Sequence, residues 1–181
     1  TLLDIRRQRQ MCIRDSVELT AEIADGWLPI FFSPSKFETI YGESIKAGLK
    51  KAGKVINDLD IAPSVSVAVV DNLEVGYNML RPLLALYIGG MGAKGRNFYY
   101  DLAVRYGYET AASDIQDLYL SGRKGEAMMK VPTALIDEIA LIGPKERIKE
   151  RLQPWLNSPV TTMNMIVHDV QALRTMVELL D

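Results

Sequence analysis

A cluster of glycines with cations beside it is the group of residues in this sequence best suited to hold a ligand. The segment GGMGAKGRN contains Gly89, Gly90, Met91, Gly92 and Gly95, together with Lys94, Arg96 and Asn97. Glycines let the backbone approach a ligand closely, and free N–H groups beside cations can hold a phosphate or a carboxylate. The segment is neither a P-loop, because GxxxxGK[ST] is absent, nor a dinucleotide fingerprint, because a helix precedes it. The alternative interpretation is a flexible link between two helices.

His168 is the only histidine in the chain, and it directly follows the last predicted strand. An imidazole at that place can act as an acid or base, or bind a phosphate. The alternative is a solvated turn in which the neighbouring Asp169 caps the next helix. Because the sequence has one histidine and one cysteine, we expect no metal site and no Cys–His pair.

Aromatic residues form a third set of candidates. Phe31, Phe32 and Ser33 end the first predicted strand, and the carboxyl end of a barrel strand is where active sites lie. Core packing of these aromatic rings is an equally good interpretation, and Trp27 is expected in the core. A further group, which could line a subunit interface or a cofactor edge, has the helical spacing that favours the core: Phe98, Tyr99, Tyr100, Tyr106 and Tyr108.

The composition excludes several classes of protein. Of the 181 residues 48% are hydrophobic and 24% are charged, and the formal net charge is −2, values typical of globular proteins. No apolar run reaches the roughly 18 to 20 residues that span a bilayer, and no block of Lys and Arg favours nucleic acid. With a single cysteine, the sequence predicts a cytoplasmic protein that binds neither membrane nor nucleic acid.

Residues 1–16 differ from the rest of the chain. They contain four Arg, two Asp and the only cysteine, Cys12, without a sustained helix or strand period. The remaining 165 residues carry 17 basic and 21 acidic side chains, which gives a net charge of −4. The segment QMCIRDS resembles a translated sequencing-adapter read. We therefore expect residues 1–16 to be a non-native or disordered head, and residues 17–181 to form one domain.

The apolar pattern of that domain alternates between strand and helix periods. It predicts strands at 27–32, 61–70 and 161–167, and helices at 17–25, 34–52, 72–88, 98–106, 110–120, 133–140, 145–156 and 170–180. Strands separated by helices pair in parallel through right-handed crossovers. Three strands cannot close a sheet, so the chain forms either a small open α/β layer or the last part of a barrel. The small side chains of Ser66 and Ala68 suit the inside of a barrel.

Four segments resemble the C-terminal half of luciferase-like monooxygenases. They are AEIADGWLP (21–29), IAPSVSVAVV with its helix, YIGGMGAKGRNFYYDLAVRYGYE (87–109) and DEIALIGPKERIKERL (137–152). The order and spacing of all four carry the resemblance, which is closest to the deazaflavin-dependent branch that includes methylene-tetrahydromethanopterin reductase-like enzymes. Such proteins are (β/α)8 barrels of about 250 residues. The resemblance implies a partial TIM barrel, with about the last three strand–helix units and extra helices before the final strand.

The resemblance also implies a chemistry. Family members transfer a hydride between coenzyme F420, a deazaflavin, or alternatively FMN, and a small organic substrate, while the protein orients both. It assigns cofactor contacts to Gly89, Gly90, Met91, Gly92, Arg96 and Asn97, makes His168 a catalytic candidate, and implies a homodimer in intact relatives. We expect this chain to be an inactive fragment. The alternative is a short, non-catalytic barrel homologue that binds a flavin or dimerises.

Overall fold

The computed structural model describes residues 8, 9 and 14–181, and the prediction for the head at residues 1–7 and 10–13, Cys12 included, lies outside them. The elements, in chain order, are β1 (Gln8–Arg9), α1 (Arg14–Ile23), β2 (Gly26–Trp27), η1 (Pro34–Lys36), η2 (Glu38–Gly42), α2 (Glu43–Ala52), η3 (Ile56–Asp58), β3 (Asp60–Ile61), β4 (Ser64–Val69), α3 (Leu73–Gly90), α4 (Phe98–Arg105), α5 (Glu109–Leu120), α6 (Lys124–Met129), α7 (Thr133–Ile139), β5 (Ala140–Gly143), α8 (Lys145–Leu156), β6 (Asn164–Val167) and α9 (Val170–Leu180). The chain is an α/β protein, as the sequence predicts.

All strand pairs that the structure describes are parallel. One sheet has the order β1-β2-β3 and the other the order β5-β4-β6. Because β3 and β4 follow each other directly in the chain, they link the two sheets. Backbone bonds continue the pairing across the link: the Ser64 amide donates to Pro29 and the Asn164 amide to Pro63.

The two faces of these strands differ in burial. Trp27, Ile61, Val65 and Val67 alternate onto one face, where they are at most 1% exposed. On the opposite face, which we call the open face, the side chains are half-buried or exposed: Leu28, Ile30, Ser64, Ser66, Asn164 and Ile166. Ser66 therefore lies on the open face, whereas Ala68, two residues further along β4, is buried.

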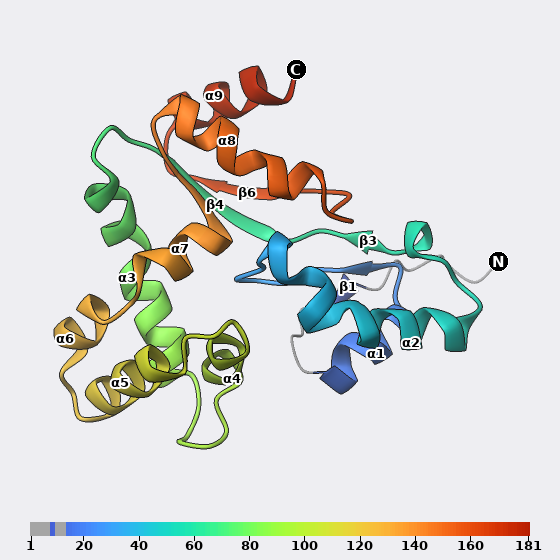
Figure 1. Cartoon of the computed structure of the whole chain (residues 1–181), viewed down its shortest axis with the longest axis horizontal. Helices are drawn as coiled ribbons and strands as arrows, with labels where there is room; N and C mark the ends of the chain where they lie inside the picture. Colours follow the sequence, from blue (N-terminus) through green and yellow to red (C-terminus); the bar gives the residue numbers. More distant parts are fainter. Residues whose placement is uncertain (1–7, 10–13) are drawn as a thin grey trace.

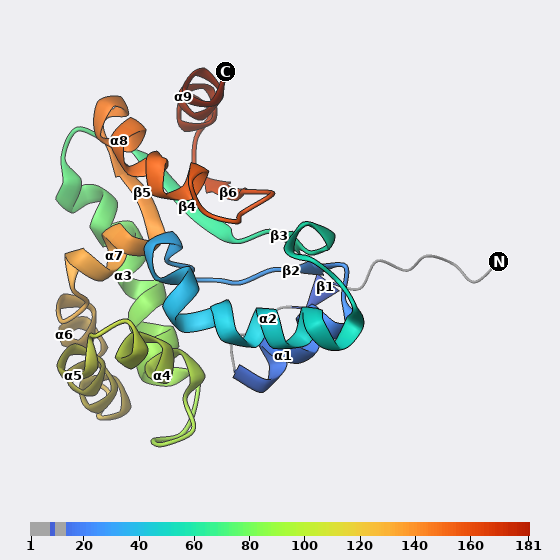
Figure 2. The same ribbon diagram turned by 45° about the vertical axis from the view of Figure 1, so that its right-hand side comes forward.

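The helices form two groups: a first group that packs along the strands, and a second group that lies to one side of them (Figures 1 and 2). α1 and α2 pack on each other beside β1–β3, and α8 and α9 lie along β4–β6. The second group consists of α3 to α7, which lie together to one side of the strands. Among the described residues, no helix has the length and apolar character needed to cross a membrane.

The structure corrects four expectations. The strand predicted at 27–32 is only Gly26–Trp27, because Pro29 cannot donate to a ladder and Phe31 takes a φ of 52°. The helix predicted at 34–52 begins as a 3-10 turn and a π turn, and becomes α-helical at Glu43. β5 and α6 were not predicted, since each is short and the residues 133–140 read as one helix. The first helix, predicted at 17–25, begins at Arg14 and ends at Ile23.

Candidate functional site

The carboxyl ends of β4 and β6 meet at one edge of the open face. Ser64 pairs with Asn164 and Ser66 with Ile166, so the alternation that exposes Asn164 and Ile166 continues to His168. His168 is exposed and directly follows β6. Its neighbour Asp169 accepts a hydrogen bond from the Ala172 amide at 2.6 Å and caps α9, as the sequence predicts. The edge therefore offers an imidazole beside the exposed Ile166.

Between β2 and η1, a tyrosine from a distant segment fixes a strained residue. Phe31 has a φ of 52°, in the left-handed region that non-glycine residues rarely adopt. The Tyr106 hydroxyl donates to the Phe31 carbonyl at 2.9 Å and accepts from the Ser33 amide at 3.1 Å. Tyr41 Oη lies 3.2 Å from the same oxygen. One buried hydroxyl thus bridges the Phe31 carbonyl and the Ser33 amide, and backbone strain such as that of Phe31 persists only where surrounding contacts hold it.

A polar cluster adjoins this turn, made of Ser33, Lys36, Tyr108 and Glu138. The Glu138 carboxylate accepts from Tyr108 Oη at 2.7 Å and from Ser33 Oγ at 3.2 Å, and it pairs with Lys36 Nζ at 3.2 Å. The Lys36 ammonium also lies 5.4 Å from the centre of the Tyr108 ring. Burial, followed by the hydrogen bond to Glu138, raises the pKa of the Tyr108 hydroxyl. The cluster joins three segments far apart in sequence and keeps Tyr108 protonated.

Ser33 is a residue that the sequence predicts at this site, whereas Lys36 and Glu138 are not predicted from it. Glu138 lies 105 residues from Ser33 in the chain, and no local pattern links the two. Of the predicted aromatic group, Tyr106 and Tyr108 do reach the segment between β2 and η2. Tyr99 reaches it as well, with its ring centre 5.8 Å from that of Phe31. Trp27 is in the core, as expected, 4.9 Å from Tyr41 between ring centres.

The glycine cluster lies at the opposite end of α3 from the ends of β4 and β6. α3 has 18 residues and is therefore about 27 Å long. Because the glycine cluster is at its far end, the structure does not bring the cluster and His168 together. Gly89 and Gly90 pack against Tyr119 of α5: a Cβ atom would lie 2.5 Å and 2.4 Å from its side chain, respectively. These two glycines therefore allow α3 and α5 to pack closely.

The other members of the cluster are also engaged in the turn between α3 and α4. The Asn97 side chain donates to the carbonyls of Tyr87 and Ile88 and accepts from the amides of Tyr99 and Tyr100. Lys94 pairs with Asp117 at 2.7 Å, while Met91 and Arg96 are exposed. Through these hydrogen bonds Asn97 caps the start of α4. Its role in cofactor binding stays a prediction.

Replacing Gly90 by alanine tests the packing interpretation. We expect a loss of about 1–3 kcal/mol in the free energy of unfolding, because the new methyl group overlaps the Tyr119 ring. In a Tyr119→Ala background the same replacement should cost much less, which chemical denaturation of the four variants measures as a coupling energy. An equal cost in both backgrounds would contradict the packing role.

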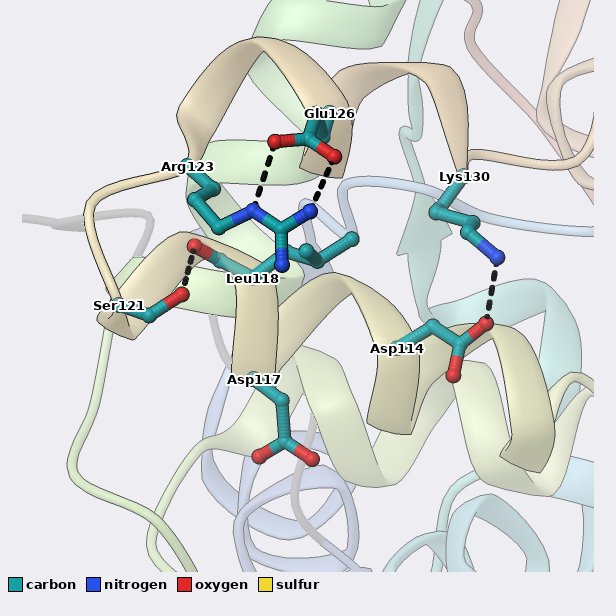
Figure 3. A pocket seen from close by; sticks show the side chains of 7 residues that line it. All are labelled: Asp114, Asp117, Leu118, Ser121, Arg123, Glu126 and Lys130. Atoms are coloured by element: carbon teal, nitrogen blue, oxygen red, sulfur yellow. Dashed lines mark hydrogen bonds and ion pairs between the residues drawn. The ribbon is translucent and has the colours of Figure 1, made fainter.

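A hollow of about 530 Å³ lies between α5 and α6 (Figure 3). Its charged side chains point toward one another: Arg123 pairs with Glu126, and Lys130 with Asp114 at 3.0 Å. Asp117 pairs with Lys94 of the glycine cluster. Since the charges of the hollow are paired with one another or with Lys94, it offers no charged group for a ligand within the described part of the chain.

Comparisons with known proteins agree with this architecture. The family model described as luciferase-like monooxygenase matches residues 14–162, so the chain belongs to that family. The resemblance found in the sequence is thereby confirmed. A protein of Mycobacterium tuberculosis assigned as a coenzyme F420-dependent oxidoreductase is 33% identical over 166 residues, which are 91% of this chain and 48% of that protein.

Solved structures share the fold at lower identity. The coenzyme F420-dependent tetrahydromethanopterin reductase of Methanopyrus kandleri superposes with a TM-score of 0.74 at 19% identity, over 96% of this chain and 49% of that one. An F420-dependent secondary alcohol dehydrogenase gives a TM-score of 0.64 at 12% identity, over 93% of this chain and 45% of that one. The chain therefore spans about half the length of the relatives it matches.

Proposed function

We propose that this chain is the C-terminal part of a coenzyme F420-dependent oxidoreductase that transfers a hydride between the deazaflavin and a small organic substrate. The observation that carries the proposal is the alignment of 91% of the chain with 48% of a relative assigned that dependence. In a protein of that kind the open face becomes the inner wall of a (β/α)8 barrel. β2, the β3–β4 strand and β6 are then the last three barrel strands, with α3 to α7 inserted before β6.

The residues at the edge of the open face fit a flat, tricyclic ring with polar edges. Ile30 and Ile166 offer apolar surface, while the Ser66 hydroxyl and the His168 imidazole offer hydrogen bonds. When bound, the deazaflavin supplies or accepts the hydride. Ile166 then supports the ring, Ser66 orients its edge, and His168 can hold or move a proton on the substrate. The polar cluster around Glu138 holds the segment that follows Ile30 through contacts with Ser33 and Lys36.

By itself the 181-residue chain is expected to bind the coenzyme weakly and to catalyse no turnover. The open face supplies one wall of a site, and half of the relatives' length has no counterpart here. Purified protein is titrated with oxidised coenzyme F420, and the fluorescence of the coenzyme reports saturable binding. With reduced coenzyme and a ketone, the absorbance of the oxidised form should not rise above the blank.

Ile166→Lys places a charge on the open face and should weaken coenzyme binding at least tenfold. Val75→Lys is the matched control, because Val75 is similarly exposed but lies on α3. No saturable binding, or equal binding by both variants, would overturn the proposed site. Tighter binding of FMN than of coenzyme F420 would overturn the choice of coenzyme, and turnover at rates typical of enzymes would overturn the inactivity of the chain.

The remaining features of the proposed enzyme are its assembly, its location and its substrate class. We propose a homodimeric, cytoplasmic enzyme that acts on a small molecule. Two neighbours support the substrate class, since one is a tetrahydromethanopterin reductase and the other a secondary alcohol dehydrogenase.

A further inference from the structure

A second concave surface runs along α2, away from the edge where β4 and β6 end. It is a groove of about 580 Å³ whose lining runs from the turn after β2 to the segments preceding β3 and β6. Its apolar lining consists of Phe37, Gly42, Ile45, Leu49, Val55, Ile56 and Pro159, and its charged rim of Glu38, Lys46, Lys50 and Lys54. The volume is that of a small-molecule pocket.

The shape of the groove depends on an irregular start to α2. Residues Glu38–Gly42 form a π turn, a rare form of helix that recurs at functional sites. Gly42 closes this turn in an ordinary helical conformation, with a φ of −55°, so its lack of a side chain is not needed for the backbone. A Cβ atom there would meet only the end of the flexible Glu38 side chain, at 2.9 Å. A larger side chain at position 42 would therefore displace Glu38 and occupy part of the groove that both residues line.

Apolar side chains at the wall of the groove are unusually exposed. Ile45 and Leu49 form a buried floor, whereas Val55 is 62% exposed and Ile56 is 38% exposed. The two exposed residues are adjacent, and they lie beside the floor residues with which they line the groove. An aliphatic group in the groove would remove this surface from water, at roughly 25 cal/mol per Å².

The charged rim is predominantly cationic, and one cation is uncommitted. Lys46 pairs with Glu38, and Lys54 Nζ donates to the Glu22 and Ala24 carbonyls at 3.3 and 2.9 Å. Lys50 is exposed, and its ammonium group forms no hydrogen bond or ion pair with the residues that the structure describes. Its ammonium group is thus free to bind an anion at the border of the apolar surface.

From this arrangement we propose that the groove binds an aliphatic carboxylate, whose chain lies over Val55 and Ile56 and whose carboxylate pairs with Lys50. The charge of the rim selects an anion, and the floor selects a chain without polar groups. Such a site is separate from the proposed coenzyme site, and it does not depend on the proposed function.

Calorimetric titration of the full chain with decanoate tests the proposal. Saturable binding at one site per chain is expected. Lys50→Glu should weaken it at least tenfold, because the pairing cation becomes an anion. Gly42→Leu should abolish it by filling the groove without backbone strain. The matched controls are Lys124→Glu and Gly125→Leu on α6, where a Cβ at Gly125 has no neighbour within 4 Å.

Each remaining outcome counts against the site. Equal binding by wild type and Lys50→Glu would show non-specific uptake of the amphiphile and overturn the proposal. Failure of the wild-type chain to bind decanoate would also overturn the proposal. Light scattering then shows whether the wild-type chain is a dimer and whether Lys50→Glu disrupts that dimer. In that case the groove would hold a second copy of the chain. Coenzyme titration in parallel separates this failure from failure of the proposed function.

Discussion

Replacing Gly48 by alanine is expected to lower the free energy of unfolding by about 3 kcal/mol or more. Gly48 lies in the buried face of α2 where α1 crosses it, and a Cβ atom there would be 2.1 Å from the Glu18 carbonyl oxygen. The Ala21 methyl group would be 2.8 Å away. Since the closest obstacle is backbone, relief requires the two helices to separate, which exposes the core beneath them.

Urea denaturation followed by circular dichroism measures the effect. Gly125→Ala is the matched control, because it lies in a helix with open space around it and should be neutral or stabilising by up to about 1 kcal/mol. Ala21→Gly should not rescue the Gly48 variant, since it leaves the clash with the Glu18 carbonyl. A loss below 1 kcal/mol for Gly48→Ala would contradict the rigid contact between α1 and α2.

The helices could be predicted because local rules decide them. α8 and α9 have the predicted bounds, 145–156 and 170–180, since each combines an apolar stripe with a defined start. Gly53 ends α2 with a φ of 67°, the left-handed conformation that a glycine after a helix predicts. In these segments, periodicity and capping residues indicate the same boundary.

The strands were harder to predict because their pairing is not local. The apolar run at 27–32 has the composition of a buried strand, yet the chain turns away after Pro29 and β5 pairs with β4 in its stead. β5 has four residues, all buried, and directly follows α7, so its apolar pattern merges with the helix. The pattern shows that residues 140–142 are buried, but their partner in the sheet is determined by long-range packing.

The candidate sites show the same division. His168 could be placed at the end of a strand from its position alone. Glu138 could not, because it acts through contacts with Ser33, Lys36 and Tyr108 from other segments. In the glycine cluster, by contrast, a local pattern typical of ligand binding has a second explanation. Its glycines allow close helix packing against Tyr119.

Removal of the Tyr106 hydroxyl in Tyr106→Phe is expected to cost about 2–4 kcal/mol. The phenylalanine keeps the ring but loses the bonds to the Phe31 carbonyl and the Ser33 amide. Ser33 is fully buried, so water cannot replace the lost acceptor. In addition, the left-handed conformation of Phe31 loses the contact that holds it, and its own cost of order 1–3 kcal/mol favours a local rearrangement.

Two measurements separate this role from ordinary core packing. Urea denaturation gives the loss in stability, and hydrogen exchange should show protection falling at the Ser33 amide before it falls elsewhere. Tyr119→Phe is the control, because it removes the hydroxyl of a half-buried tyrosine on α5 and keeps the ring that Lys124 overlies. If Tyr106→Phe instead lowered the hydrogen-exchange protection of all amides equally, the hydroxyl would stabilise the whole core and the specific role at Ser33 would be contradicted. Selective loss of protection at Ser33 should also weaken binding at the proposed coenzyme site, since the segment after β2 then no longer presents Ile30 in a fixed position.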